Sequence, residues 1–304
     1  MVDLKLGVDI CFAVKRWPEA VQWLDIVKNV LKLDIVEFDS DFLDPLYVND
    51  TDTTKIAGEI KELAQKEGVT IHNYFTGEMT HNINMFADPD KRIARYGKLW
   101  FEKALRLTTE LGAKGIGSHF GTIPASAINK KEYDYYLDNK IETIIYLSEI
   151  ASNEGHKILM LEQMYSPAEP PYTIKQTYDM LEKINKRSKL YVSPVIDLGH
   201  SCCQNFDHSE EDRNPYNWLR EFGGICEVIH VQQATSEVSN HWPFTKEYNE
   251  KGIIKPEKVI EAIQKSGSKE NYLMLEIFFP LRANNEQVLS SMKETVNYWK
   301  EYIS

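Results

Sequence analysis

The chain of 304 residues has only four cysteines, and no two of them form the CxxC spacing of a metal or redox motif. They are Cys11, Cys202, Cys203 and Cys226. Without any sign of secretion, such cysteines are typical of reduced thiols in a cytoplasmic protein. The sequence places no base to activate Cys202 or Cys203 as a nucleophile, so we expect both to be small loop residues.

Long apolar runs and an excess of positive charge are also absent. No run is long enough to cross a bilayer, and residues 1–5 lack the basic and apolar segments of a signal peptide. We therefore expect no membrane association and no secretion. The chain has 46 acidic and 35 basic residues, and its net charge of −11 offers no attraction to a phosphate backbone. Nucleic acid is not an expected partner.

A glycine-rich phosphate-binding fingerprint is missing after the first predicted strand, where Gly7 is followed by Val8, Asp9 and Ile10. Its absence counts against a doubly wound open sheet, which is the alternative fold. Short apolar runs alternate with helical patterns along the whole chain, and this alternation predicts a parallel sheet. The predicted strands cover residues 4–12, 35–38, 69–75, 115–119, 157–162, 191–197, 226–231 and 272–279. Eight strand–helix units predict an α/β fold, a single (β/α)8 TIM barrel, as one domain over residues 1–304.

Four of the apolar runs each lead into one potential metal ligand: Glu162, Asp197, His230 and Glu276. These residues are predicted near the carboxyl ends of four consecutive strands, where a barrel carries its chemistry. A buried carboxylate is costly unless its charge is compensated, so three carboxylates and one imidazole together indicate one shared cation. The donor set suits Mn²⁺ or Mg²⁺, and it also accepts Co²⁺ or Zn²⁺. The alternative is that each is a core polar group paired with a neighbour.

Several further side chains are predicted to line the barrel mouth. His200 follows Asp197 by three residues and is expected to contact a substrate oxygen, while His72 and His119 end strand-like runs. For His72 and His119, the alternative is a hydrogen-bonded histidine in the core. Glu37 lies on the second predicted strand and either lines the site or forms an ion pair inside the barrel. The loop over residues 232–255 is long and irregular, as functional loops often are.

Cationic and aromatic residues follow the first, seventh and eighth predicted strands. They are candidates to clamp an anionic or polyol substrate, with solvated surface charge as the alternative for the cations. The candidates are Lys15, Arg16, Trp17, Trp242 and Arg282.

The motifs LEQ at Glu162, DLGH at Asp197 to His200, IHVQ around His230 and LEIF around Glu276 resemble the xylose-isomerase-like TIM-barrel superfamily over the whole chain. Their order and spacing are similar to the ketose 3-epimerase branch. The resemblance implies a divalent metal held by these two glutamates, the aspartate and His230. It also implies that Glu162 and Glu276 face opposite sides of the substrate carbon and that His200 contacts the substrate.

One position departs from this pattern. The epimerases carry an arginine six residues after the metal histidine, whereas this chain has Ser236. His241, Lys246 or Arg282 would have to replace that arginine, or the substrate differs. The segments 12–18 and 241–244 resemble the erythrulose-phosphate (tetrulose-phosphate) epimerases more narrowly.

We therefore predict a metal-dependent isomerase or epimerase of a sugar or sugar phosphate, with Glu162 and Glu276 as catalytic residues that act through an enediolate. A decarboxylase of a β-keto sugar acid is one alternative. Another is a DNA-repair enzyme of the endonuclease IV type, which the superfamily also contains. That match breaks at Ser239-Asn240-His241, where the family has an aspartate. The sequence leaves open whether the chain forms a homo-oligomer.

Overall fold

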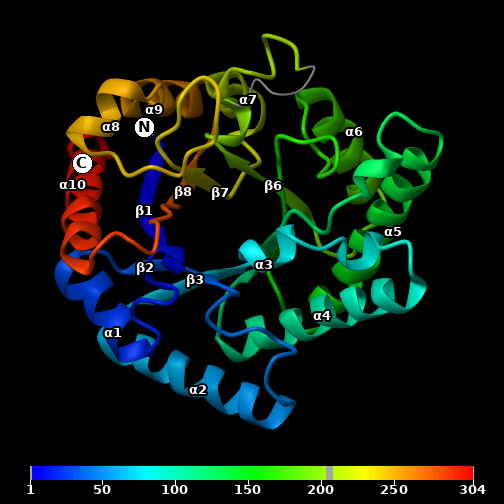
Figure 1. Cartoon of the computed structure of the whole chain (residues 1–304), viewed down its shortest axis with the longest axis horizontal. Helices are drawn as coiled ribbons and strands as arrows, with labels where there is room; N and C mark the ends of the chain where they lie inside the picture. The colour runs from blue at the N-terminus through cyan, green and yellow to red at the C-terminus, as the bar shows by residue number, and fades with distance from the viewer. Residues whose placement is uncertain (1, 203–207, 304) are drawn as a thin grey trace. The chain divides into compact units, whose positions relative to one another are not determined.

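Eight parallel strands follow one another in chain order around a closed barrel in the computed structural model, which describes residues 2–202 and 208–303 (Figure 1). The strands are β1 (Asp3–Asp9), β2 (Ile35–Asp39), β3 (Thr70–Phe75), β4 (Gly115–Ser118), β5 (Ile158–Glu162), β6 (Val192–Asp197), β7 (Val228–Val231) and β8 (Glu270–Leu275). The predicted (β/α)8 fold class is confirmed. The contacts divide the chain into two units: unit 1 holds residues 1–37, 63–70 and 195–304, and unit 2 holds 38–62 and 71–194. One continuous domain over 1–304 stays a prediction.

In unit 1, β1 pairs with both β2 and β8, β8 also pairs with β7, and β7 pairs with the end of β6. The register sets Asp197 opposite His230, and His230 opposite Met274. The helices of this unit are α1 (Ala20–Asp25) with a following π-helical turn (Ile26–Val30), α7 (Pro215–Phe222), α8 (Lys246–Lys251), α9 (Pro256–Lys265) and α10 (Asn285–Ile303). In Figure 1, α10 runs beside β1, and its side chains Val288, Met292, Val296 and Trp299 are buried.

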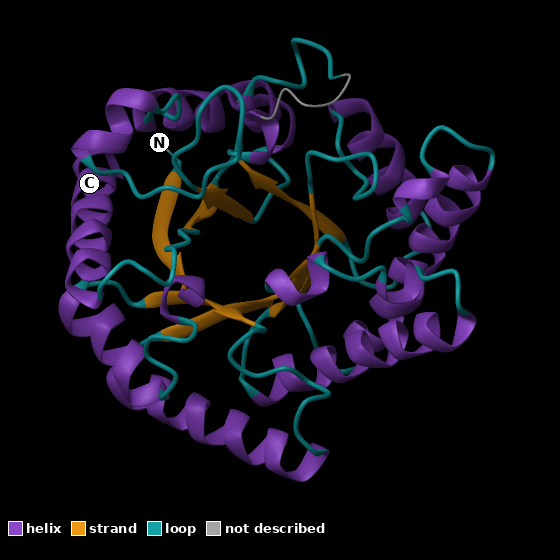
Figure 2. Cartoon of the chain, in the orientation of Figure 1, coloured by secondary structure: helices purple, strands orange, loops and turns teal. Residues whose placement is uncertain are grey.

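In unit 2, β4 pairs with β3 on one side and with β5 on the other. Figure 2 shows the strands of the chain in orange and the helices in purple. Its helices are α3 (Glu78–His81), α4 (Lys91–Glu110), α5 (Glu132–Asn153), α6 (Ile174–Asn185) and most of α2 (Asp50–Glu67). Gly68 and Gly112 lie just after α2 and α4 and have φ of +66° and +74°, which side chains with a Cβ rarely adopt.

The structure corrects three predicted boundaries. The first strand ends at Asp9, because Ile10–Ala13 form a 3₁₀ turn that the Asp9 carboxylate caps. The last strand ends at Leu275, so Glu276 lies just beyond it. The loop predicted over 232–255 contains α8, which starts where the Thr245 side chain accepts a hydrogen bond from the Tyr248 backbone N–H.

The predictions for the cysteines are only partly tested. Cys11, Cys202 and Cys226 are buried thiols, and burial raises the pKa of Cys226 to about 12, which keeps that thiol protonated. Cys203 lies outside the described residues. Among the residues that the structure describes, no helix is both long and apolar enough to cross a membrane.

A substitution at Gly115 tests how closely β4 packs against β5. A Cβ at this position would overlap the carbonyl oxygen of Ile158, its partner on β5. We expect Gly115→Ala to lower the free energy of unfolding by about 1–3 kcal/mol. Gly58, in α2, has open space around it, so Gly58→Ala should instead raise stability by about 0.5–1 kcal/mol. Urea unfolding of both variants checks this pair, and a Gly115→Ala protein as stable as the wild type would contradict the packing.

Candidate active site

His230 in β7 is held between two glutamates of unit 1. Its Nε2 lies 2.7 Å from Glu37 Oε1 in β2, and neither side chain is exposed to solvent. Its Nδ1 lies 3.3 Å from Glu276 Oε2. A histidine ligand typically donates its second ring N–H to a carboxylate, which fixes the tautomer and the ring orientation. Glu37 occupies this place: its carboxylate lies against His230 Nε2, and Nδ1 is directed at Glu276.

Asp197 is the last residue of β6 and is completely buried. Its Oδ1 accepts hydrogen bonds from the backbone N–H groups of Gly199 and His200, at 2.6 and 2.8 Å. Burial alone would raise the pKa of Asp197, but the nearby histidines and a hydrogen bond from Gln232 outweigh it and hold the pKa well below its usual value. Asp197 is therefore an ionised carboxylate at neutral pH.

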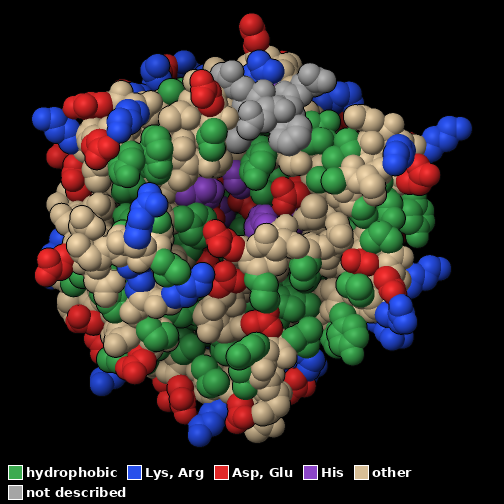
Figure 3. All heavy atoms as spheres, in the orientation of Figure 1, with side chains coloured by type: hydrophobic (Ala, Val, Ile, Leu, Met, Phe, Trp, Pro, Cys, Tyr) green, Lys and Arg blue, Asp and Glu red, His purple; other side chains and the backbone are tan. Residues whose placement is uncertain are grey.

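Glu276 completes a set of three donors from unit 1. Its backbone N–H donates to the carbonyl oxygen of Val231, and this bond fixes the start of the segment after β8. One ligand atom each of Asp197, His230 and Glu276 lies within 4.8 Å of the others. Figure 3 shows histidine and acidic side chains gathered close together on one face. Two oxygens and one nitrogen fit Mn²⁺, Mg²⁺, Co²⁺ or Zn²⁺, so these residues could hold a divalent cation.

Gln232 is a positioning residue that the sequence did not reveal. Its Nε2 donates to both carboxylate oxygens of Asp197, at 2.9 and 3.0 Å, and its Oε1 accepts the backbone N–H of His241 at 2.6 Å. It thereby joins the end of β6 to the loop after β7. The only available signal was its place in the IHVQ motif two residues after His230, which does not predict these partners.

His200 and His241 lie beside this set. The ring centroids of the two histidines are 5.9 Å apart, and one ligand atom of each lies within 4.8 Å of Asp197 and of the other. His241 has φ of +48°, which is rare for a residue with a side chain. Burial lowers the pKa of His241 to about 3, although the charge of Asp197 raises it, so His241 is neutral at pH 7. Both predicted substrate histidines are thus close to the donor set.

Three further predicted site residues belong to unit 2. Glu162 ends β5 and is 2% exposed. His119 follows β4 directly, and the register of Ser118 with Leu161 places it next to the end of β5. His72 is buried in β3, where its Nδ1 lies 2.8 Å from Asn73 Oδ1. This contact is the hydrogen-bonded core arrangement that was the alternative for His72.

His119 has neighbours that the sequence did not reveal. Its ring stacks on that of His81 at 3.9 Å between centroids, and His81 Nδ1 lies 3.1 Å from Glu169 Oε1. His81 is in α3, a helix of four residues that is too short to show a hydrophobic period. Glu169 is in the segment after β5, seven residues beyond Glu162.

The predicted clamp residues of unit 1 have different surroundings. Arg16 donates to the carbonyl oxygens of Pro280 and Ala283, both at 2.8 Å, so it holds the segment after β8. Lys15 and Arg282 are exposed. The ring centroid of Trp17 lies 6.2 Å from that of Phe12, and the ring centroid of Trp242 lies 4.7 Å from that of Tyr248. Ser236, which departs from the family pattern, is exposed.

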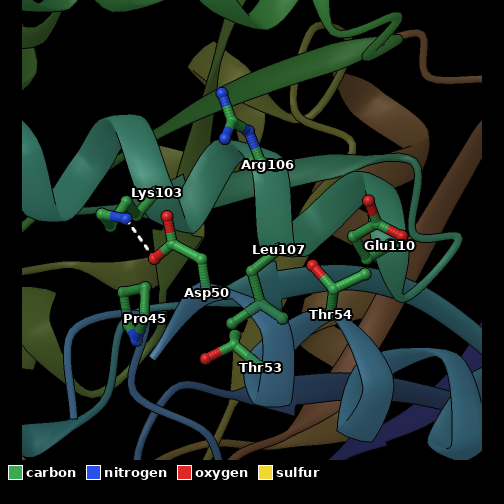
Figure 4. A pocket seen from close by; sticks show the side chains of 8 residues that line it. All are labelled: Pro45, Asp50, Thr53, Thr54, Lys103, Arg106, Leu107 and Glu110. Carbon is green, nitrogen blue, oxygen red and sulfur yellow. Dashed lines mark hydrogen bonds and ion pairs between the residues drawn. The ribbon is translucent and has the colours of Figure 1, made fainter. Parts of the chain in front are cut away.

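A small cavity between α2 and α4 in unit 2 is not a candidate for the substrate site. Its volume of about 30 Å³ admits a water molecule but no sugar. Figure 4 shows the Asp50 carboxylate and the Lys103 ammonium directed at each other as an ion pair. The cavity is lined by Pro45, Asp50, Thr53, Thr54, Lys103, Arg106, Leu107 and Glu110.

Known proteins that are similar to this chain include two named as a sugar epimerase and a sugar isomerase. D-erythrulose 1-phosphate 3-epimerase of Brucella abortus (strain 2308) is 26% identical over 310 residues, which cover 99% of this chain and 96% of the relative. A solved structure from Rhodospirillum rubrum ATCC 11170, provisionally named a xylose isomerase, is 24% identical with a TM-score of 0.90, over 98% of this chain and 99% of that one. The IOLI protein, solved with a zinc atom, is 17% identical with a TM-score of 0.70 over 99% of both chains.

The two structural matches show the fold, and the erythrulose-phosphate epimerase agrees with the resemblance read from the motifs. A family model described as xylose isomerase-like TIM barrel matches residues 28–300. The match covers most of the chain, so the protein belongs to the xylose isomerase-like TIM barrel family.

Proposed function

We propose that this protein is a divalent-metal-dependent 3-epimerase of a ketose or ketose phosphate. The observation that carries the proposal is the convergence of Asp197, His230 and Glu276 from the ends of three consecutive strands. The substrate class is supported by the relative that epimerises D-erythrulose 1-phosphate. An isomerase that interconverts an aldose and a ketose would use the same type of site.

Glu162 is the proposed fourth ligand. It ends β5, which precedes β6 in the strand order, and it is almost fully buried. A shared cation would offset the cost of burying this carboxylate. We propose Mn²⁺ or Mg²⁺ because carboxylates predominate, with Co²⁺ or Zn²⁺ as the alternatives that imidazole also accepts. The zinc atom in the IOLI protein supports a metal in this fold.

The bound ion would polarise the C2 carbonyl of the ketose and acidify the neighbouring C3–H bond. Glu162 and Glu276 are proposed to move the proton. One carboxylate removes the C3 proton as a general base, and the electron pair left on C3 is delocalised as an enediolate. The other glutamate, protonated, then returns a proton to the opposite face of C3 and inverts that centre.

His200 is proposed to donate a hydrogen bond to a substrate oxygen, beside the neutral imidazole of His241. His72, His119, Trp17 and Trp242 are retained as proposed contacts with the sugar. For a distal phosphate we propose Lys15 and Arg282, because the guanidinium of Arg16 already binds backbone carbonyl oxygens.

The two alternative reactions give different products. A decarboxylase of a β-keto sugar acid would release CO₂, and an endonuclease of the endonuclease IV type would cleave DNA. The net charge of −11 counts against the second reaction. Release of CO₂ from such an acid, without epimerisation of a ketose, would replace the proposed function with the first alternative.

Replacement of either proposed proton carrier should stop carbon–hydrogen exchange. We expect Glu162→Gln and Glu276→Gln each to lower the exchange of the C3 proton of D-erythrulose 1-phosphate with deuterated water by about 10²–10⁴-fold, because an amide cannot carry the proton. NMR spectroscopy follows the exchange. The exposed Glu286→Gln in α10 is the matched control and should exchange normally. Normal exchange in either active-site variant contradicts the two-glutamate mechanism.

Gln232→Leu tests whether Gln232 positions a metal ligand. The variant removes the donor to both oxygens of Asp197, so we expect the affinity for Mn²⁺ to fall about 10–100-fold. Isothermal titration of metal-free protein measures the change. The exposed Gln264→Leu in α9 is the control and should bind as the wild type does. Equal affinity in Gln232→Leu would show that Asp197 needs no such support.

A further inference from the structure

A second cluster of metal-binding side chains lies entirely within unit 2. It consists of His81 from α3, His119 after β4 and Glu169 from the segment after β5, and no residue of the proposed epimerase metal site belongs to it. One ligand atom of each of the three lies within 4.8 Å of the others. Two imidazoles and one carboxylate form a donor set that recurs in zinc and non-haem iron proteins.

The distances within this cluster fit a shared ion. Ligand atoms that bind one Zn²⁺ at about 2.0–2.2 Å in tetrahedral geometry lie roughly 3.3 Å from each other. His81 Nδ1 and Glu169 Oε1 are 3.1 Å apart, close to that spacing. The His81 and His119 rings are stacked at 3.9 Å and inclined by only 23°, so the two imidazoles lie face to face. The same 3.1 Å also fits a simple hydrogen bond, and the number of metal ions bound per chain distinguishes a hydrogen bond from a metal site.

The cluster is held rigidly and opens at one side. His119 is fully buried and the Glu169 side chain is 10% exposed, whereas the His81 side chain is 30% exposed and gives access to solvent. His119 is followed by Phe120 and Gly121 in left-handed conformations, with φ of +54° and +74°. The buried amino group of Lys140 donates to the Gly121 carbonyl oxygen at 3.1 Å and so fixes this turn.

Glu169 has two further neighbours. The hydroxyl of Thr122 lies 3.5 Å from the same Oε1 that faces His81. The charge of Lys140 also acts on Glu169, but burial lowers the pKa of Lys140 to about 7, so most of the amine is neutral at pH 8. A cation bound between the three ligands would then meet little electrostatic repulsion from Lys140.

We propose that His81, His119 and Glu169 form a second binding site for a divalent transition metal ion, with Zn²⁺ or Co²⁺ as the ions that suit two imidazoles and one carboxylate. Three protein ligands leave a coordination position for water or a substrate oxygen. The register of Ser118 with Leu161 places this site beside the end of β5, where Glu162 lies. The site exists whether or not the protein is an epimerase.

The test is the number of metal ions bound per chain. Protein stripped of metal with a chelator is dialysed at pH 8 against a small excess of Co²⁺, and bound metal is measured by elemental analysis and by visible absorption. The variants are His81→Phe, which retains a ring against His119, and Glu169→Gln. We expect the wild type to bind two equivalents and each of these variants to bind one, with loss of one set of absorption bands. Glu78→Gln, an exposed neighbour in α3, should bind two.

Asp197→Asn separates this proposal from the proposed function. It should remove the other equivalent and leave the absorption bands of the second site unchanged. A single equivalent in the wild type that His81→Phe removes would support the second site and contradict the epimerase metal. Binding by His81→Phe and Glu169→Gln equal to that of the wild type, with unchanged spectra, would overturn the second site. Circular dichroism melting of each metal-free variant shows whether it is folded.

Discussion

The buried contact between Glu37 and His230 is the interaction on which the proposed active site depends. Neither side chain reaches solvent, so the imidazole, or a cation beyond it, would offset the cost of burying the carboxylate charge. The contact uses Nε2 and thereby directs Nδ1 at Glu276. If the ring were rotated, the nitrogen of the three-donor set would point away from the two oxygens. The orientation of one imidazole thus connects β2, β7 and the segment after β8.

Asp197, the second proposed metal ligand, is oriented by hydrogen bonds to its carboxylate oxygens. Its Oδ1 is fixed by two backbone N–H groups in the turn that follows β6, and both oxygens accept from Gln232. Gly199 belongs to this turn, where a Cβ would overlap the Gln232 amide. Burial raises the pKa of Asp197, but the nearby histidines and the hydrogen bond from Gln232 outweigh burial and lower the pKa, so Asp197 stays ionised. An acceptor fixed in this way loses little freedom when it binds a cation.

The sequence was sufficient for the fold class and for the residue types of the proposed metal site. Alternation of strand and helix depends on local patterns, and Asp197, His230 and Glu276 each follow an apolar run that marks a strand end. The contacts that orient these residues join distant parts of the chain, as Glu37 and His230 do, and no local pattern encodes them. His81 and α8 were missed because helices of four and six residues show too little periodicity. The metal, the substrate and the role of Glu162 remain proposals that rest on chemistry.

A crystal structure of the protein grown with Mn²⁺, with anomalous diffraction data, tests the central claim most directly. We expect an anomalous peak bonded at about 2.0–2.3 Å to Glu162, Asp197, His230 Nδ1 and Glu276, with Glu37 still on His230 Nε2. No peak among these four residues, or a Glu162 carboxylate directed away from the ion, would contradict the shared four-ligand site.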